Sequence, residues 1–281
     1  MEALLAPFEF GFMQRAFALS FLAAIPTALL SCFLVVRGWA LLGDAVSHSV
    51  LPGVVLAYVL GFPLLIGAFI AAMFCAIASG FISANSRIKP DTAMGVVFSG
   101  MFGLGIVLYT AIETDVHLDH ILFGNLLGVE THELWTSGII GVAVCVGLLL
   151  FWRDLRFQSF DPAQAQLVGV RVNMLHYGLL SALSLTIVAT LSATGLILAI
   201  GLLIAPGAIA FLITRTFTQM MIVSMLVCVF SLFAGVYLSF FLDSAPAPTA
   251  VLVFTVVFIA VFFAKRLSTQ TSLSTVLQRI T

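Results

Sequence analysis

The sequence predicts an all-α polytopic membrane protein with eight or nine transmembrane helices, and two observations carry this prediction. Hydrophobic residues make up 62% of the 281-residue chain and charged residues only 8%, with a mean hydropathy of +1.22. A soluble domain needs far more charge to cover its surface. The apolar runs are also long enough to cross a bilayer, which takes about 20 helical residues.

Nine apolar runs reach this length, and they do not alternate with polar residues as the strands of a membrane barrel would. The predicted spans are 16–36, 39–60, 64–84, 93–112, 133–152, 174–192, 196–214, 219–241 and 249–264. Residues 1–281 are therefore expected to form one transmembrane domain in the lipid bilayer. The first run lacks a cleavage site and should remain as a span. The net charge of −1 gives no reason to expect nucleic acid as a partner.

The positive charges indicate an orientation, because Lys and Arg collect in cytoplasmic loops. With nine alternating spans, one side receives Arg87, Lys89, Arg153, Arg156, Arg171, Arg215, Lys265, Arg266 and Arg279. The opposite loops carry Glu113, Asp115, Asp119, Glu130, Glu133 and Asp243 with no Lys or Arg. An acidic outer face attracts cations, although sorting of positive charge alone produces the same asymmetry.

Residues 113–132 are too polar and too short in their apolar part to cross the membrane, so they are expected to form a short re-entrant or interfacial segment on the outer side. His117, Asp119 and His120 cluster there. This cluster suits capture of a cation or docking of a delivery protein, but a solvated loop explains it as well.

Residues 153–173 form the largest loop on the predicted cytoplasmic side, and a short helix is expected within it. Asp161 suits the N-cap, Pro162 the first helical position and Gly169 the C-terminal stop. A short capped helix on this face is suited to docking a partner, and the bland alternative is an ordered loop. The residues concerned are Asp161, Pro162, Ala163, Gln164, Ala165, Gln166, Leu167, Val168 and Gly169.

Asp44 is the one carboxylate that cannot be assigned to a loop or a terminus, and His48 follows it at i+4. In a helix the two side chains lie on one face, about one turn apart. A charge inside a membrane helix costs roughly 2.5–3.5 kcal/mol on insertion scales, so a chain that keeps one there is expected to use it. Carboxylate and imidazole suit Mn²⁺, Fe²⁺ or Zn²⁺. The alternative is that the pair merely fixes helix packing.

Two prolines bear on this prediction. Pro52 lacks an N–H, which is expected to kink the helix and free the His48 carbonyl as a further oxygen ligand. Pro206 is expected to kink the seventh span. Ser47 and Ser49 are expected to bond the helix backbone rather than a metal.

The sequence gives no support for a catalytic role. There is no HExxH motif, no second intramembrane Gly-Asp motif and no phosphate-binding loop, so this chain is not expected to be an enzyme or to hydrolyse ATP by that route. A divalent cation is expected as cargo, with no permanently bound cofactor. The rival is a proton-coupled secondary metal transporter, which the lack of further intramembrane carboxylates disfavours.

Five stretches of the sequence resemble those of a known protein family. They are RGWALLGDAVSHSVLPGVVLAY (37–58), SRIKPDTAMGVVFSGMFGLGIVLY (86–109), DVHLDHILFGNLLGV (115–129), FDPAQAQLVGV with LHYGLL (160–180) and LLIAPGAIAFL (202–212). In this order they resemble the ABC-3 family of metal-ion permeases, and within it the Yfe/Sit-type chelated-iron and manganese permeases.

The resemblance implies the membrane subunit of a bacterial ATP-binding-cassette importer in the inner membrane. It implies cytoplasmic ATPase subunits, a periplasmic or lipoprotein metal-binding protein, and a second permease copy or a related permease chain. Asp44 and His48 fall on the family's pore metal site, and Asp161–Gly169 falls where the family docks its ATPase. The resemblance leaves open which of Mn²⁺, Fe²⁺ or Zn²⁺ is carried.

Overall fold

The computed structural model describes residues 2–112, 124 and 126–278, and the regular structure in these ranges is entirely helical. Nine segments of the described chain are long and apolar enough to cross a membrane, which confirms the predicted fold class. They are Gly11–Arg37, Leu41–Leu60, Leu64–Ser83, Pro90–Ala111, Thr131–Leu150, Val172–Leu191, Thr194–Ile213, Phe217–Leu242 and Pro246–Leu267.

The helices that carry these spans alternate with very short turns, except between α5 and α7 and around two short helices. In chain order the helices are α1 (Glu2–Glu9), α2 (Gly11–Arg37), α3 (Ala40–Leu60), α4 (Leu64–Asn85), α5 (Pro90–Ala111), α7 (Thr131–Leu150), α8 (Trp152–Phe160), α9 (Pro162–Leu167), α10 (Val172–Ile213), α11 (Phe217–Leu242) and α12 (Pro246–Gln278).

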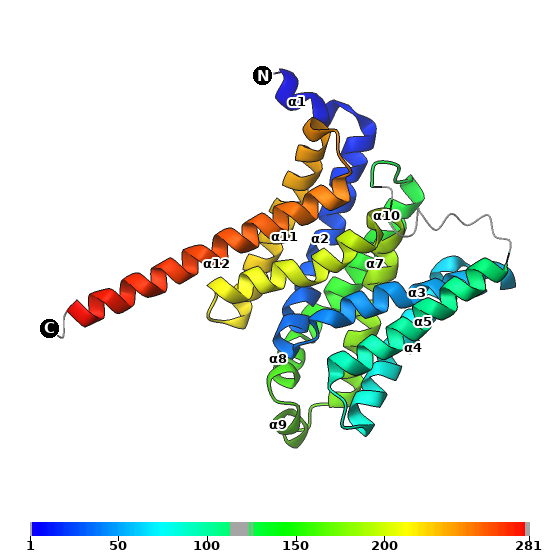
Figure 1. Ribbon diagram of the computed structural model, residues 1–281, viewed down its shortest axis with the longest axis horizontal. Helices are drawn as coiled ribbons and strands as arrows, with labels where there is room; N and C mark the ends of the chain where they lie inside the picture. Colours follow the sequence, from blue (N-terminus) through cyan, green and yellow to red (C-terminus); the bar gives the residue numbers. More distant parts are fainter. Residues whose placement is uncertain (1, 113–123, 125, 279–281) are drawn as a thin grey trace.

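Two groups of helices flank α10. Helices α3, α4 and α5 pack on one another, and α2, α11 and α12 form the second group (Figure 1). Helix α10 contacts members of both groups, and α7 packs between α2 and α10. The buried core therefore runs through α2, α3, α4 and α10, where Phe33, Leu42, Leu183 and Leu203 are almost completely enclosed.

Helix α10 contains two membrane spans joined at a single break. Gly195 has φ 72° and ψ 172°, values that a residue with a side chain rarely adopts, so the helix axis changes direction there. Gly124 packs against this break, because a Cβ on Gly124 would overlap the backbone of Thr194 and Gly195. Helix continues through Pro206, which lies eleven residues beyond the break.

Helix α3 is held by close approaches at glycines. Gly53 and Gly67 face each other across the α3–α4 contact, and a Cβ on either one would overlap the other's carbonyl oxygen. Gly105 on α5 lies equally close to Leu51 and Pro52. Small residues at such crossings let membrane helices pack backbone to backbone.

Most of the positively charged side chains lie at one end of the spans, whereas Arg15 lies near the start of α2, at the opposite end. Arg87 and Lys89 lie in the α4–α5 turn, Arg153 and Arg156 on α8, and Arg215 in the α10–α11 turn. The two turns and α8 lie along the lower and lower-left side of Figure 1, whereas α1 and the α11–α12 turn lie at the top. Which of the two ends is cytoplasmic stays a prediction from the positive-inside rule.

Ser31 on α2 joins α2 to α10 by two hydrogen bonds. Its hydroxyl donates to the Ile204 carbonyl at 3.2 Å and accepts from the Gly207 N–H at 2.9 Å. Hydrogen bonds between membrane helices contribute on average about 0.6 kcal/mol and at most about 1.7 kcal/mol each. Ser31→Ala is therefore expected to lower the unfolding temperature of the purified protein in detergent.

Ser239→Ala is the matched control, because within the described ranges the buried Ser239 hydroxyl bonds only the Val236 carbonyl of its own helix. An equal fall in unfolding temperature for the two variants would show that the α2–α10 hydrogen bonds contribute nothing.

Candidate metal site and the junction around Arg37

Asp44 and His48 lie together on α3, as predicted from their spacing. The Nε2 atom of His48 is 3.3 Å from the Oδ1 atom of Asp44. Their side chains are 34% and 27% exposed, respectively, on the surface of the single chain. The other carboxylates of the described spans, Asp91 and Glu133, lie in the first turns of α5 and α7, whereas Asp44 lies beyond the first turn of α3.

The His48 ring is packed on one side by α5. Its centroid is 5.9 Å from that of Phe98 and 5.3 Å from that of Phe102, the latter in an edge-to-face arrangement. The Nδ1 atom of His48 is buried and has no hydrogen-bond partner among the described residues. Nε2 lies beside the Asp44 carboxylate, so it is the nitrogen placed to coordinate a metal ion together with that carboxylate.

The rest of α3 keeps this pair in place. Ser47 and Ser49 donate to the Gly43 and Val46 carbonyls of their own helix at 2.7 and 2.8 Å, which confirms that they bond the backbone. The Cys75 thiol of α4 donates to the Ala45 carbonyl at 3.7 Å. Asp44 and His48 are therefore presented by a helix fixed by its neighbours on both sides.

The pair alone is an incomplete coordination shell. Within the described residues, no group of three or more His, Cys, Asp or Glu side chains is close enough to hold a metal ion. The predicted contribution of the His48 carbonyl stays a prediction. So do the kinks expected at Pro52 and Pro206, since both prolines lie inside helices. His117, Asp119 and His120 lie outside the described residues.

The short helix predicted after the fifth span is present as α9. The Asp161 carboxylate accepts from the Gln164 N–H at 2.9 Å, and Pro162 is the first helical residue. Gly169 has a φ of 88° and ends the segment. The side chains of Leu167 and Val168 are 86% and 71% exposed, an unusual degree for apolar residues outside the membrane spans. The two residues form an exposed apolar edge at the end of α9.

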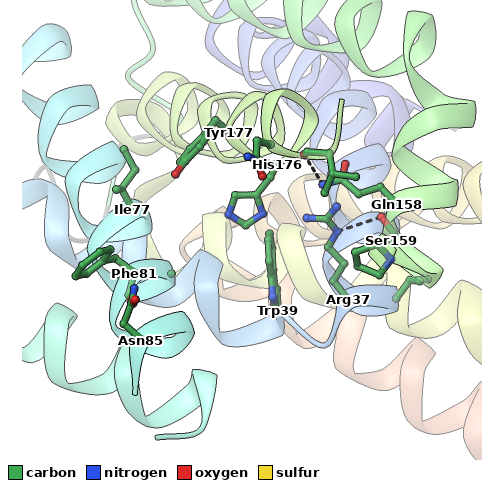
Figure 2. Close-up of a pocket in the computed structure, with 14 residues that line it drawn as sticks. Arg37, Trp39, Ile77, Phe81, Asn85, Gln158, Ser159, His176 and Tyr177 are labelled. Atoms are coloured by element: carbon green, nitrogen blue, oxygen red, sulfur yellow. Dashed lines mark hydrogen bonds between the residues drawn. The ribbon is translucent and has the colours of Figure 1, made fainter. Parts of the chain in front are cut away.

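A cavity of about 580 Å³ lies at the junction of the α2–α3 turn, α4, α8 and the start of α10. Figure 2 shows Arg37 between Trp39 and Ser159, with the His176 ring beside Trp39. The Arg37 guanidinium is 4.6 Å from the centre of the Trp39 ring, and its Nε donates to the Ser159 hydroxyl at 3.1 Å. These contacts join segments far apart in the sequence.

Sequence reasoning missed this junction. No functional role was predicted from the sequence for Arg37, Ser159 or His176. The available signal was an arginine and a tryptophan flanking Gly38, between two spans that have no other room for a loop. This pattern predicts a tight turn, but it does not indicate which distant residues the turn contacts.

Comparison with known proteins shows the family of this chain. The model of the ABC 3 transport family matches residues 9–265, which is nearly the whole chain. This chain belongs to the ABC 3 transport family. The matched range contains Asp44, His48 and the α8–α9 segment.

Two relatives in the family carry names that state a cargo. The chelated iron transport system membrane protein YfeD of Yersinia pestis is 52% identical, over 88% of this chain and 83% of the relative. The manganese transport system membrane protein MntC of Halalkalibacterium halodurans is 43% identical, over 91% of this chain and 88% of the relative.

A solved structure shares the fold. PsaBC from Streptococcus pneumoniae in complex with Fab has a TM-score of 0.84 and 33% identity, covering 93% of this chain and 95% of that chain. This chain is therefore a multi-pass membrane protein, and its architecture is that of the PsaBC structure.

Proposed function

We propose that this chain is the permease subunit of an ATP-binding-cassette importer that moves Mn²⁺ or Fe²⁺ across the bacterial inner membrane. The observation that carries the proposal is the Asp44–His48 pair, with its two ligand atoms 3.3 Å apart on a helix that spans the membrane. Carboxylate oxygen and imidazole nitrogen suit both ions. The iron and manganese relatives support the same cargo.

The ligand chemistry does not exclude Zn²⁺, and selectivity is then divided between this site and a delivery protein. Two protein ligands bind an ion weakly, which transport requires because the ion has to leave as well as enter. A closed four-ligand site would retain the metal.

A second copy of the chain completes the site in this proposal. Helix α5, which flanks His48, is the most exposed of the nine spans in the described chain. Asp44 and His48 are themselves partly exposed rather than sealed in the core. Pairing of two copies along α3 and α5 would place two carboxylates and two imidazoles around one passage. A related permease chain with the same motif would serve equally.

The outer face is proposed to receive a metal-binding protein. Glu130, Glu133 and Asp243 are the charged residues at the outer ends of α7 and α11 in the described chain. This acidic rim attracts cations and suits a docking protein with complementary positive charge.

The ATPase subunits are proposed to dock on α9 and the residues that follow it. The capped helix is a rigid unit on the face that carries the positive charge, and its exposed apolar edge is formed by Leu167 and Val168. ATP hydrolysis belongs to that partner, and this chain supplies the passage.

Replacing Leu167 and Val168 by aspartate together is expected to remove ATPase binding. The double variant places two charges in an interface that depends on apolar contact, and buried unpaired charge is strongly unfavourable. Co-purification of the ATPase with the tagged permease in detergent measures the loss.

Leu267→Asp provides the control, because Leu267 is 64% exposed at the end of the last span, which the orientation places on the same side. This variant should retain the ATPase. Retention of the ATPase by the Leu167/Val168 double variant would rule out α9 as the docking site.

The experiment that tests the proposed function is uptake of labelled Mn²⁺ and Fe²⁺ into vesicles that contain the permease, the ATPase and the binding protein. ATP-dependent uptake is expected. Uptake that persists without the ATPase would instead support the proton-coupled carrier.

A further inference from the structure

Arg37 connects α8 to the helix that carries the metal ligands. Arg37 is the last residue of α2, and its Nε donates to the Ser159 hydroxyl at 3.1 Å. That hydroxyl in turn donates to the Leu155 carbonyl of α8 at 2.6 Å, which fixes its direction. Asp161, the N-cap of α9, follows Ser159 by two residues. A displacement of α9 therefore acts on Arg37 through one intervening turn.

The same guanidinium also contacts the start of α3. It lies over the Trp39 ring at 4.6 Å, and Trp39 is the residue immediately before α3. The intervening Gly38 has φ 69°, and the N–H groups of Gly38 and Trp39 donate to the Val35 and Leu34 carbonyls. This closed turn has little freedom to absorb a displacement. Asp44 follows Trp39 by five residues, which is less than two helical turns.

Helix α10 is tied to the same junction. The His176 ring meets the Trp39 ring edge to face, with centroids 5.3 Å apart. The Gln158 side chain, adjacent to Ser159, donates to the Val172 carbonyl at 2.8 Å. Beside these contacts lies the cavity of about 580 Å³, lined by Trp39, His176 and Pro162 of α9, so the aromatic rings have space to move (Figure 2).

The geometry points to Arg37 and Ser159 as positioning residues that couple movement of the ATPase-docking helix to the metal-ligand helix α3. This inference rests on the proposed function, since it assumes an ATPase on α9 and a metal at Asp44. Neither residue contacts the ion. Arg37 acts because its guanidinium donates to Ser159 through Nε while its central carbon lies over the Trp39 ring, and the ammonium of lysine has no equivalent of this planar fork.

The test compares three serine variants in vesicles with the ATPase and the binding protein, and measures Mn²⁺ ions taken up per ATP hydrolysed. Ser159→Ala removes the acceptor for Arg37 and is expected to lower this ratio about fivefold or more, the low end of couplings between distant sites. Ser159→Thr retains the hydroxyl and should restore the ratio. Ser137→Ala removes a different buried contact between helices, the 2.6 Å hydrogen bond to the Ala189 carbonyl.

The ratio separates coupling from folding, because a variant that merely folds poorly loses uptake and hydrolysis together. Ser137→Ala is therefore expected to keep the wild-type ratio even where its yield falls. A wild-type ratio for Ser159→Ala, or an equal loss in Ser159→Thr, would overturn the coupling role of Ser159 while leaving metal transport intact. Absence of uptake in the wild-type complex would overturn the proposed function and the coupling with it.

Discussion

Asp44→Asn is expected to lower ATP-dependent Mn²⁺ uptake by more than about 100-fold while leaving the protein inserted and folded. The amide has nearly the same shape as the carboxylate but no charge, so it cannot neutralise a divalent cation. Loss of a residue that only supports a metal ligand typically costs 10–100-fold in affinity or activity, and loss of a ligand should cost more. Uptake of labelled Mn²⁺ into vesicles at equal permease content measures the effect.

Asp91→Asn makes the same chemical change at an exposed position in the first turn of α5, which has no assigned role in metal binding or in docking. Loss of one exposed negative charge at a helix N-terminus costs only about 0.3–1 kcal/mol. Near-normal uptake is expected for this control. Near-normal uptake by Asp44→Asn as well would contradict the assignment of Asp44 as a ligand and favour a role in helix packing.

Gly53→Ala is expected to produce the largest loss of stability among the conservative changes considered. The added methyl group would overlap the Gly67 carbonyl oxygen and come within 2.6 Å of the Ala71 side chain, so α3 and α4 have to separate. Overpacking of this kind costs about 1–3 kcal/mol, and here it also shifts the helix that carries Asp44. Thermal unfolding in detergent and metal uptake are both expected to fall.

Gly147→Ala is the matched control on α7, because no atom lies within 4 Å of the position of its Cβ. Alanine favours helix over glycine by about 1 kcal/mol, so this variant should be as stable as the wild type or more stable. If Gly53→Ala also unfolded at the wild-type temperature, the close α3–α4 crossing would not be a determinant of stability.

The spans were predictable because continuous apolar runs have few alternatives in lipid. The runs 174–192 and 196–214 were correctly separated, although the structure joins them in one helix with the break at Gly195. A glycine is required there because the backbone adopts a positive φ and Gly124 packs against it. The sequence carries more than twenty glycines, and nothing local distinguishes this one.

The candidate site was predictable where its members are close in sequence. The helical repeat alone was enough to predict that Asp44 and His48 lie together. The N-cap residue Asp161 alone was enough to predict α9. The junction around Arg37 brings together residues 37, 159 and 176, whose contact depends on how α2, α8 and α10 pack. Helix periodicity contains no information on that packing, which is why Arg37, Ser159 and His176 were not grouped from sequence.

A divalent ion in transit is proposed to bind the Asp44 carboxylate and the His48 imidazole. The most direct measurement is an anomalous difference map, at the manganese absorption edge, from crystals of the permease complex soaked with Mn²⁺. The account predicts a peak at coordination distance from an Asp44 carboxylate oxygen and from Nε2 of His48. A peak elsewhere in the membrane region, with none at this pair in a transport-competent complex, would contradict it.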